Sequence, residues 1–215
     1  SRMNAILGVG HDSESGRFTL RVQPGVLLSD IHTVLAGGEF DTATWSEESL
    51  SNLKNMQAAG PQMFTPDPTE ASATVGGMVA CNASGARSFH YGPTRDHVLA
   101  LRVVLASGMV IALRRGGQKA DGQQFSLECE DGSLVEGVLP DYETPAVKNA
   151  AGYFARNDMD LIDLFIGMEG TLGVVSEIEV LLAPAPPVMW GVMAFLPDEA
   201  GALSLVRALR GERTG

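Results

Sequence analysis

Two segments concentrate glycine and other small residues directly in front of apolar runs. The first runs from Thr65 to Gly85 and contains the pair Gly76-Gly77, and the second, Gly167 to Val180, reads GMEGTLGVVSEIEV. Small side chains leave backbone N–H groups bare, so such a loop can approach a pyrophosphate or a flat ring closely. Turns and tight helix packing use the same residue types, and the spacing alone favours that plainer interpretation.

Other chemical sites have little support in the sequence. There is no GxGxxG motif after a strand and no GxxxxGK[ST] loop. Cys81 and Cys129 form no CxxC pair and the histidines are scattered, so we expect neither a disulfide framework nor a metal site. We interpret Cys81 as a small buried filler, and we assign His90 and His97 to the surface or to structure.

Composition limits the class of partner. The chain has 215 residues, is 45% apolar, and carries 15 Lys and Arg against 26 Asp and Glu, for a net charge of -11. This charge opposes binding to nucleic acid or to anionic lipid surfaces. No apolar run approaches the roughly 20 residues needed to span a bilayer. We therefore expect a cytoplasmic protein with no nucleic-acid partner and no membrane span.

Apolar periodicity predicts the elements that carry the two segments. Strands are expected at Phe18 to Val22, Val98 to Leu105, Met109 to Leu113, Phe125 to Cys129, the end of Gly170 to Leu182, and Val188 to Leu196. The pair at 98–113 should form the centre of the sheet, and Phe125 to Cys129 should open a hairpin. Helices are expected from a Ser29 cap to Leu35, from Ser46 to Gln57, after an Asp158 cap, and from Asp198 to Leu209.

Several motifs occur in a fixed order along the chain. They are Pro66-Asp67-Pro68, TVGG from Thr74, NASG from Asn82, YGPTRD from Tyr91, and EGTLGVV from Glu169. Together they resemble the FAD-binding oxidases of the vanillyl-alcohol oxidase and p-cresol methylhydroxylase (PCMH) type, with most similarity to the branch of glycolate oxidase subunits and D-lactate dehydrogenases. The segments VQPGV and KNAAGY fit the same branch, so the resemblance covers about Met3 to Pro184.

The resemblance implies a fold and a reaction. The fold would be α+β, with a mixed or antiparallel sheet flanked by helices, as the second subdomain of a PCMH-type FAD-binding domain over residues 1–184. Residues 39–62 would be an insertion, and 188–215 the start of a substrate or cap domain. The parent enzyme would oxidise a D-2-hydroxy acid, such as lactate or glycolate, by hydride transfer to non-covalent FAD and then to an unknown electron acceptor.

The resemblance also implies cofactor contacts, whereas no catalytic or metal-ligating residue carries over. Along the pyrophosphate and ribityl chain of FAD would lie Pro66, Asp67, Thr74, Gly76 and Gly77. Near the flavin would lie Cys81, Asn82, Ala83, Ser84 and Gly85. Backbone groups toward the flavin and adenine would come from Glu169, Gly170, Thr171, Leu172, Gly173, Val174 and Val175. The two segments should therefore meet at one edge of the sheet, and the Asn82 amide should have a partner if it is buried.

The match to this family is incomplete. The family's first, glycine-rich FAD subdomain and most of its substrate domain have no counterpart, so we expect part of a longer flavoprotein that alone is inactive and binds FAD weakly or not at all. One alternative is a non-catalytic scaffold or subunit that binds partners through the helix in 39–62 and an acidic surface. Another is an unrelated α/β binding domain, which predicts no contact between the two segments.

Overall fold

The computed structural model describes residues 3–145, 147 and 149–211. The chain divides into two compact units, Ser1–Ala185 and Pro186–Gly215. The first unit contains the sheets and both glycine-rich segments. Within the described part of the chain, no helix is long and apolar enough to cross a membrane.

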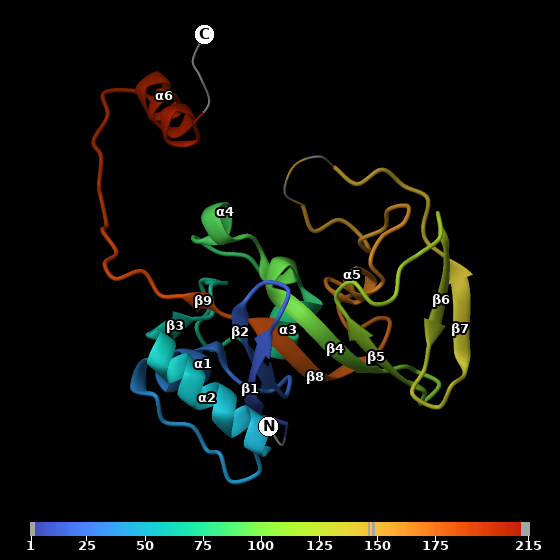
Figure 1. Cartoon of the computed structure of the whole chain (residues 1–215). Helices are drawn as coiled ribbons and strands as arrows, with labels where there is room; N and C mark the ends of the chain where they lie inside the picture. Colours follow the sequence, from blue (N-terminus) through green and yellow to red (C-terminus); the bar gives the residue numbers. More distant parts are fainter. Residues whose placement is uncertain (1–2, 146, 148, 212–215) are drawn as a thin grey trace. The chain divides into compact units, whose positions relative to one another are not determined.

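An antiparallel five-stranded sheet forms the centre of the first unit (Figure 1). Its order is β1-β2-β8-β4-β5, with bounds β1 Ile6–Asp12, β2 Arg17–Val22, β8 Val174–Leu181, β4 Val98–Val104 and β5 Val110–Arg114. The predicted α+β fold with an antiparallel sheet flanked by helices is confirmed. The predicted position of the 98–113 pair is wrong in part, because β8 is the central strand and β5 is an edge.

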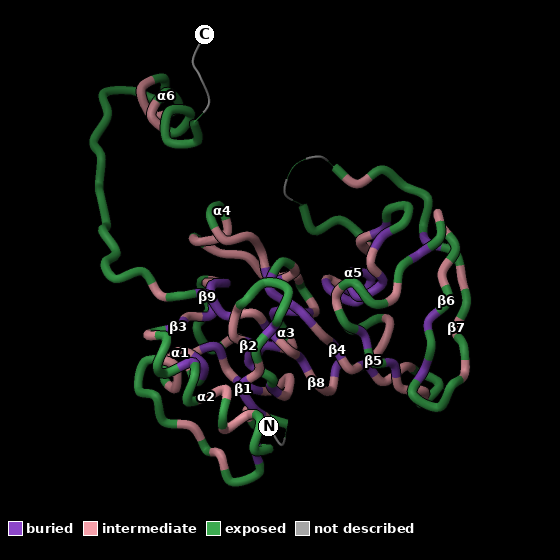
Figure 2. Tube along the Cα trace, viewed as in Figure 1, coloured by how far each residue is buried: buried purple, intermediate pink, exposed green. Residues whose placement is uncertain are grey.

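One face of this sheet supplies much of the core, and Figure 2 shows buried residues along its strands. Apolar residues alternate inward on four strands: Leu20 and Val22, Leu101 and Val103, Ile111 and Leu113, Ile178 and Val180. The opposite face carries charge. Ala100 pairs in register with both Arg114 and Glu179, and the Arg114 side chain reaches across this small residue to Glu179, at 2.9 Å.

Two helices cover the β1 end of the sheet (Figure 1). Helix α1, Leu28–Gly37, ends at Gly38 in a left-handed conformation (φ 71°), but it begins after Leu27 with no side-chain cap, so the predicted Ser29 cap is wrong. Helix α2, Glu47–Ala59, begins after Ser46, close to the predicted range of 46–57. The Ser46 hydroxyl caps it by accepting a hydrogen bond from Ser49 N at 3.2 Å.

Strand β1 was not predicted, and the segment containing α2 protects it. Trp45 Nε1 donates to Ile6 O at 3.0 Å, and Asn52 Nδ2 donates to Val9 O at 3.5 Å. A Cβ at Gly8 would lie 2.3 Å from Ser49 Oγ, so this glycine allows α2 to approach. Sheet edges carry unpaired polar groups, and α2 and its flanking loop satisfy some of them here.

The remaining elements of the first unit are short. They are β3 Gln62–Met63, α3 Val75–Ala80, α4 Ser88–Tyr91, the 3-10 helix η1 Thr94–His97, β6 Gln124–Glu128, β7 Leu134–Val138, α5 Ile162–Phe165 and β9 Ala183–Pro184. Strand β3 pairs with β9. The predicted hairpin is confirmed as β6–β7.

Helix α5 is a single turn that follows Leu161, so the predicted Asp158 cap is wrong. Asp158 has φ 57°, and its Oδ1 accepts a hydrogen bond from Gly122 N at 2.8 Å. Asp158 therefore ties two loops together instead of starting a helix.

The second unit contains one helix in its described part, α6 Glu199–Leu209, in agreement with the helix predicted over 198–209. Asp198 caps it by accepting a hydrogen bond from Gly201 N at 2.7 Å. The strand predicted at 188–196 is absent from this described segment. Trp190 and Phe195 there are 85% and 88% exposed. A lone segment has no neighbouring strand with which to form a ladder, so apolar periodicity alone overpredicts here.

Candidate cofactor site

Helix α3 carries the first glycine pair and is anchored on its inner side. Val75 and Val79 are fully buried. Thr74, in an extended conformation before the helix, accepts a hydrogen bond through its hydroxyl from Gly77 N at 3.1 Å. This side-chain cap, together with the buried valines, fixes where the helix begins.

Gly76 is required by packing against the protein. A Cβ there would lie 2.5 Å from Pro24 Cβ and 2.9 Å from Pro24 O. Gly76 N donates to Pro24 O at 2.8 Å, and Gly77 N is bonded to Thr74. The two N–H groups that we predicted to be bare are therefore both bonded within the chain.

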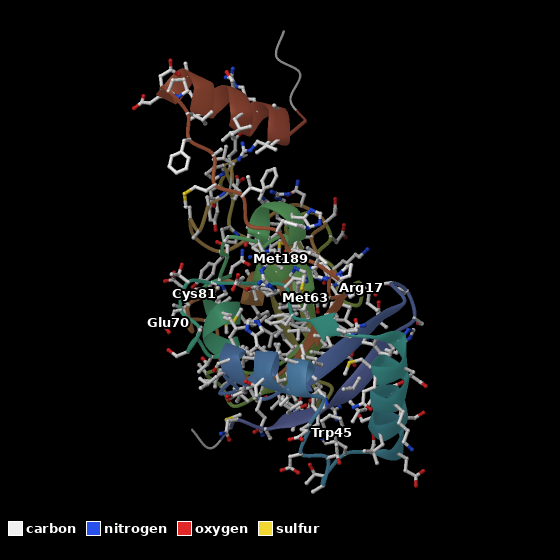
Figure 3. All side chains as sticks on the ribbon, turned by 90° about the vertical axis from the view of Figure 1, so that its left-hand side faces the viewer. Arg17, Trp45, Met63, Glu70, Cys81 and Met189 are labelled. Carbon is white, nitrogen blue, oxygen red and sulfur yellow. The ribbon has the colours of Figure 1, made fainter. Side chains whose placement is uncertain are left out.

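The end of α3 is exposed and carries a strained residue. Cys81, labelled in Figure 3, is exposed, so its interpretation as a buried filler is wrong. It directly follows the last residue of α3. Asn82 has φ 45°, a left-handed conformation that few residues with a Cβ adopt. Its Oδ1 accepts from Arg95 N at 2.9 Å, so the half-buried amide has the partner that we expected.

The second segment lies directly against the end of α3. Gly167 N donates to Val79 O and Glu169 N donates to Ala80 O, both at 2.9 Å. Glu169 is again left-handed, with φ 53°. The two glycine-rich segments therefore meet through backbone hydrogen bonds, which an unrelated binding domain does not predict.

Left-handed backbone concentrates at this meeting point. Among the described residues, three other than glycine have positive φ, and Asn82 and Glu169 are two of them. Gly170 follows with φ 75°, is exposed, and has open space where a Cβ would point. Such conformations cost free energy and cluster at ligand sites, so this seam between 80–83 and 167–170 is the best candidate site in the chain.

The 65–68 loop lies against the end of the first segment. A Cβ at Gly85 would lie 1.5 Å from Asp67 O, so only glycine fits there. Gly85 N donates to Ser88 Oγ at 2.8 Å, and Asp67 forms an ion pair with Arg87 at 3.2 Å. Pro66, the preceding residue of the loop, is buried. The predicted Asp67 and Gly85 are therefore neighbours.

The far end of the second segment belongs to the sheet. A Cβ at Gly173 would lie 2.7 Å from both Val103 Cγ1 and Val104 O on β4. Val175 is buried. Gly76 and Gly173 are thus each explained by close packing on another part of the protein. The contact between the two segments is made by other residues, at 79–80 and 167–169.

Exposure divides the predicted cofactor residues into three groups. The exposed ones are Gly77, Cys81, Glu169, Gly170, Thr171 and Val174. The half-buried ones are Asp67, Thr74, Gly76, Asn82, Ala83, Ser84, Gly85, Leu172 and Gly173. Pro66 and Val175 are buried. The exposed group is the surface that a ligand can reach.

Behind the seam lies a cluster of charged residues around the buried Asp163, which was not predicted from the sequence. Asp163, 8% exposed, pairs with Arg95 Nη1 at 3.1 Å and with Arg115 Nη1 at 2.8 Å. Burial lowers the pKa of the Arg95 guanidinium, while Asp163 opposes this shift. A signal was available, because Asp163 interrupts the apolar run LIDLFI, and a charge in such a run requires a buried partner.

Two further polar contacts support the surrounding loops. Tyr153 OH donates to Thr171 Oγ1 at 2.7 Å. His97 is buried, with Nε2 2.8 Å from Tyr91 O and Nδ1 3.1 Å from Thr65 Oγ1, and this burial lowers the pKa of His97. His97 therefore has a structural role.

Comparison with known proteins finds one family model and several relatives that match this chain. Residues 48–114 match the family model described as FAD binding domain, a range that starts inside α2 and ends with β5. A D-lactate dehydrogenase of Anaerostipes hadrus is 33% identical over 186 residues, 86% of this chain and 26% of that protein. Glycolate oxidase subunit GlcD of Bacillus subtilis (strain 168) has the same identity and coverage. The chain thus spans about a quarter of the length of these relatives.

A solved structure shares the fold. Alkyldihydroxyacetonephosphate synthase is 19% identical and superposes with a TM-score of 0.55, covering 98% of this chain and 26% of that chain.

Proposed function

We propose that this chain, which carries an FAD-binding domain related to those of D-lactate dehydrogenases and glycolate oxidase subunits, forms part of the FAD site of an oxidoreductase acting on a D-2-hydroxy acid. Bound FAD supplies the hydride acceptor, and the protein supplies binding and orientation. The electron acceptor is a separate partner. Substrate-binding and acid-base groups are proposed to lie in another part of the enzyme.

The seam between 80–83 and 167–170 is the observation that carries this proposal. Its exposed residues are Cys81, Glu169 and Gly170. Cys81 has a small side chain and Gly170 has none, so a flat ring can approach the backbone at these two positions. Left-handed Asn82 and Glu169 turn the backbone where the two segments meet. The net charge of -11 gives no general attraction to an anionic cofactor, so local backbone groups must hold it.

The other candidate contacts extend from the seam along α3. Gly77 is exposed on the first turn of α3, and Asp67 with Arg87 lies beside Gly85. We propose that the pyrophosphate and ribityl chain follow this side, and that the flavin lies nearer to Cys81. Pro66 and Val175 are buried, so we propose that they have a structural role and do not contact the cofactor.

The second unit is proposed to begin the substrate or cap domain. In its described part, helix α6 has no buried residue, and Leu203 and Leu209 are 63% and 76% exposed. Exposed apolar residues in a series are typical of a surface that packs on further protein. Residues 1–184 would then be the second subdomain of the FAD-binding domain.

Titration with FAD tests this function. The full-length gene product should purify yellow and be bleached anaerobically by D-lactate or glycolate, whereas the 215-residue chain alone should bind FAD weakly or not at all. Cys81→Gln adds bulk at the seam and should lower the FAD affinity of the full-length protein at least about tenfold, the factor for loss of about 1.4 kcal/mol. Ala58→Gln, at an exposed position on α2, is the matched control and should leave affinity unchanged.

Two results would contradict the proposal. One is a full-length protein that binds no flavin. The other is equal FAD affinity in the Cys81→Gln and wild-type proteins, which would move the cofactor away from the seam.

A further inference from the structure

We propose that Arg95 is a positioning residue for the cofactor site, fixing the turn at 166–169 against Asn82. The inference rests on the proposed function, because it assigns a role within the same site. Arg95 lies beneath the seam. Its main chain contacts Asn82 of the first glycine-rich segment, and its side chain contacts Ile166, the residue directly before the second.

The guanidinium of Arg95 holds the second segment. Nη1 donates to Asp163 O at 2.6 Å, and Nη2 donates to Ile166 O. Ile166 directly precedes Gly167, whose N–H is bonded to Val79 O. The ring of Phe154 covers the guanidinium, with Cζ 4.3 Å from its centroid. These contacts fix the planar guanidinium in position. The peptide group between Ile166 and Gly167 is then held at both ends, its carbonyl by Arg95 and its N–H by Val79 O.

The main chain of Arg95 holds the first segment. Its N–H donates to Asn82 Oδ1 at 2.9 Å, and this contact stabilises a residue whose backbone is left-handed. Asparagine tolerates this conformation because its side chain can hydrogen-bond locally. Arg95 therefore joins left-handed Asn82 to the 166–169 turn, which contains left-handed Glu169.

Arg115 provides a comparison within the same cluster. It also pairs with Asp163, at 2.8 Å, but its other contacts are Arg95 O and Val98 O, behind the seam. The charged groups that face the Arg95 guanidinium are Asp163, Arg115 and Asp96. Both arginines thus neutralise Asp163, whereas Arg95 also binds the carbonyl of the 166–169 turn.

Hydrogen exchange of the 215-residue chain separates these roles. In Arg95→Lys, exchange at Gly167, Glu169 and Ala83 should accelerate about tenfold or more, the factor expected for one lost charge-assisted hydrogen bond. In Arg115→Lys, the matched control, these three amides should exchange as in the wild type even though an Asp163 ion pair is also changed. Equal exchange at the seam in the two variants overturns the proposal.

A second variant covers the case in which Arg95→Lys does not fold. Asn82→Gly keeps the left-handed backbone without strain but removes the acceptor for Arg95 N, so exchange at Arg95 and at Gly167 should accelerate. Unchanged exchange at both amides in Asn82→Gly overturns the proposed link.

FAD binding by the full-length gene product completes the test. With Arg95→Lys, affinity should fall about tenfold and the visible flavin band should change shape, while Arg115→Lys should bind as the wild type does. If the wild type binds no FAD, the proposed function fails but the exchange result still decides the positioning role. If the wild type binds FAD and Arg95→Lys binds it equally, the positioning proposal fails and the proposed function remains.

Discussion

The main-chain N–H of Glu169 donates to the carbonyl of Ala80 at 2.9 Å, joining two glycine-rich segments that are far apart in the sequence. Glu169 reaches this bond with φ 53°. A residue with a Cβ pays about 1 to 2 kcal/mol for the left-handed region, so the contact is made at a cost in stability.

Substitutions at Glu169 should reveal that cost. Glu169→Val should lower the free energy of unfolding by about 2 kcal/mol, since a β-branched residue is poorly suited to positive φ. Glu169→Gly should change it by less than about 1 kcal/mol, because relief of strain offsets the greater freedom of glycine in the unfolded chain. Urea unfolding measures both. Glu128→Val, at an exposed position on β6, is the control and should have little effect; a similar loss there would contradict the assignment of strain.

Gly85 should tolerate no side chain. Gly85→Ala places a Cβ 1.5 Å from Asp67 O, so the two loops must separate, and the free energy of unfolding should fall by about 3 kcal/mol. Gly37, the last residue of α1, has open space within 4 Å of the point where a Cβ would lie, and Gly37→Ala should gain about 0.5 to 1 kcal/mol. Thermal and urea unfolding of the pair measure the contrast. Equal stabilities would mean that the contact between Asp67 and Gly85 is absent.

Strands and hairpins could be predicted where local alternation reflects burial. Leu20 and Val22 on β2 face the core, and their period of two is visible without any tertiary information. Strand β1 was missed because Gly8 and Gly10 dilute its pattern. Glycine is required at these two positions by residues elsewhere in the chain, because a Cβ at Gly8 would meet Ser49 and a Cβ at Gly10 would meet Thr19. Local sequence does not contain that information.

The candidate site was predictable only in outline. The order of motifs predicts that residues near 80 and 169 meet, and they do. Glycine content alone does not distinguish a ligand from a protein neighbour, however, and Gly76 proves to pack on Pro24. The role of Arg95 depends on a carbonyl at Ile166, which no side-chain pattern encodes.

Trp45 should stabilise the sheet edge through its indole N–H. Trp45→Phe removes the donor to Ile6 O, and the free energy of unfolding should fall by about 1 to 3 kcal/mol because the residue is buried, 8% exposed. Trp190→Phe is the matched control: Trp190 is 85% exposed and its loss should leave stability unchanged. Urea unfolding followed by circular dichroism compares the two. An equal effect at both positions would argue against the edge contact.

His97 should make stability depend on pH. Burial lowers its pKa in the folded state below the ordinary value of 6.5, so the unfolded chain binds a proton more readily than the folded chain does. The contribution of neutral His97 is therefore complete above about pH 6.5 and is lost as pH falls from there through the lower folded-state pKa.

The matched pair His97→Gln and His90→Gln tests this dependence, since His90 is exposed. Urea unfolding between pH 7.5 and 5 should show a decline in wild type and His90→Gln that is smaller in His97→Gln. At pH 7.5, His97→Gln should already be less stable, by about 1 to 3 kcal/mol, because Thr65 and Tyr91 lose their buried partner. The same pH slope in all three proteins would show that His97 is not held neutral by its burial.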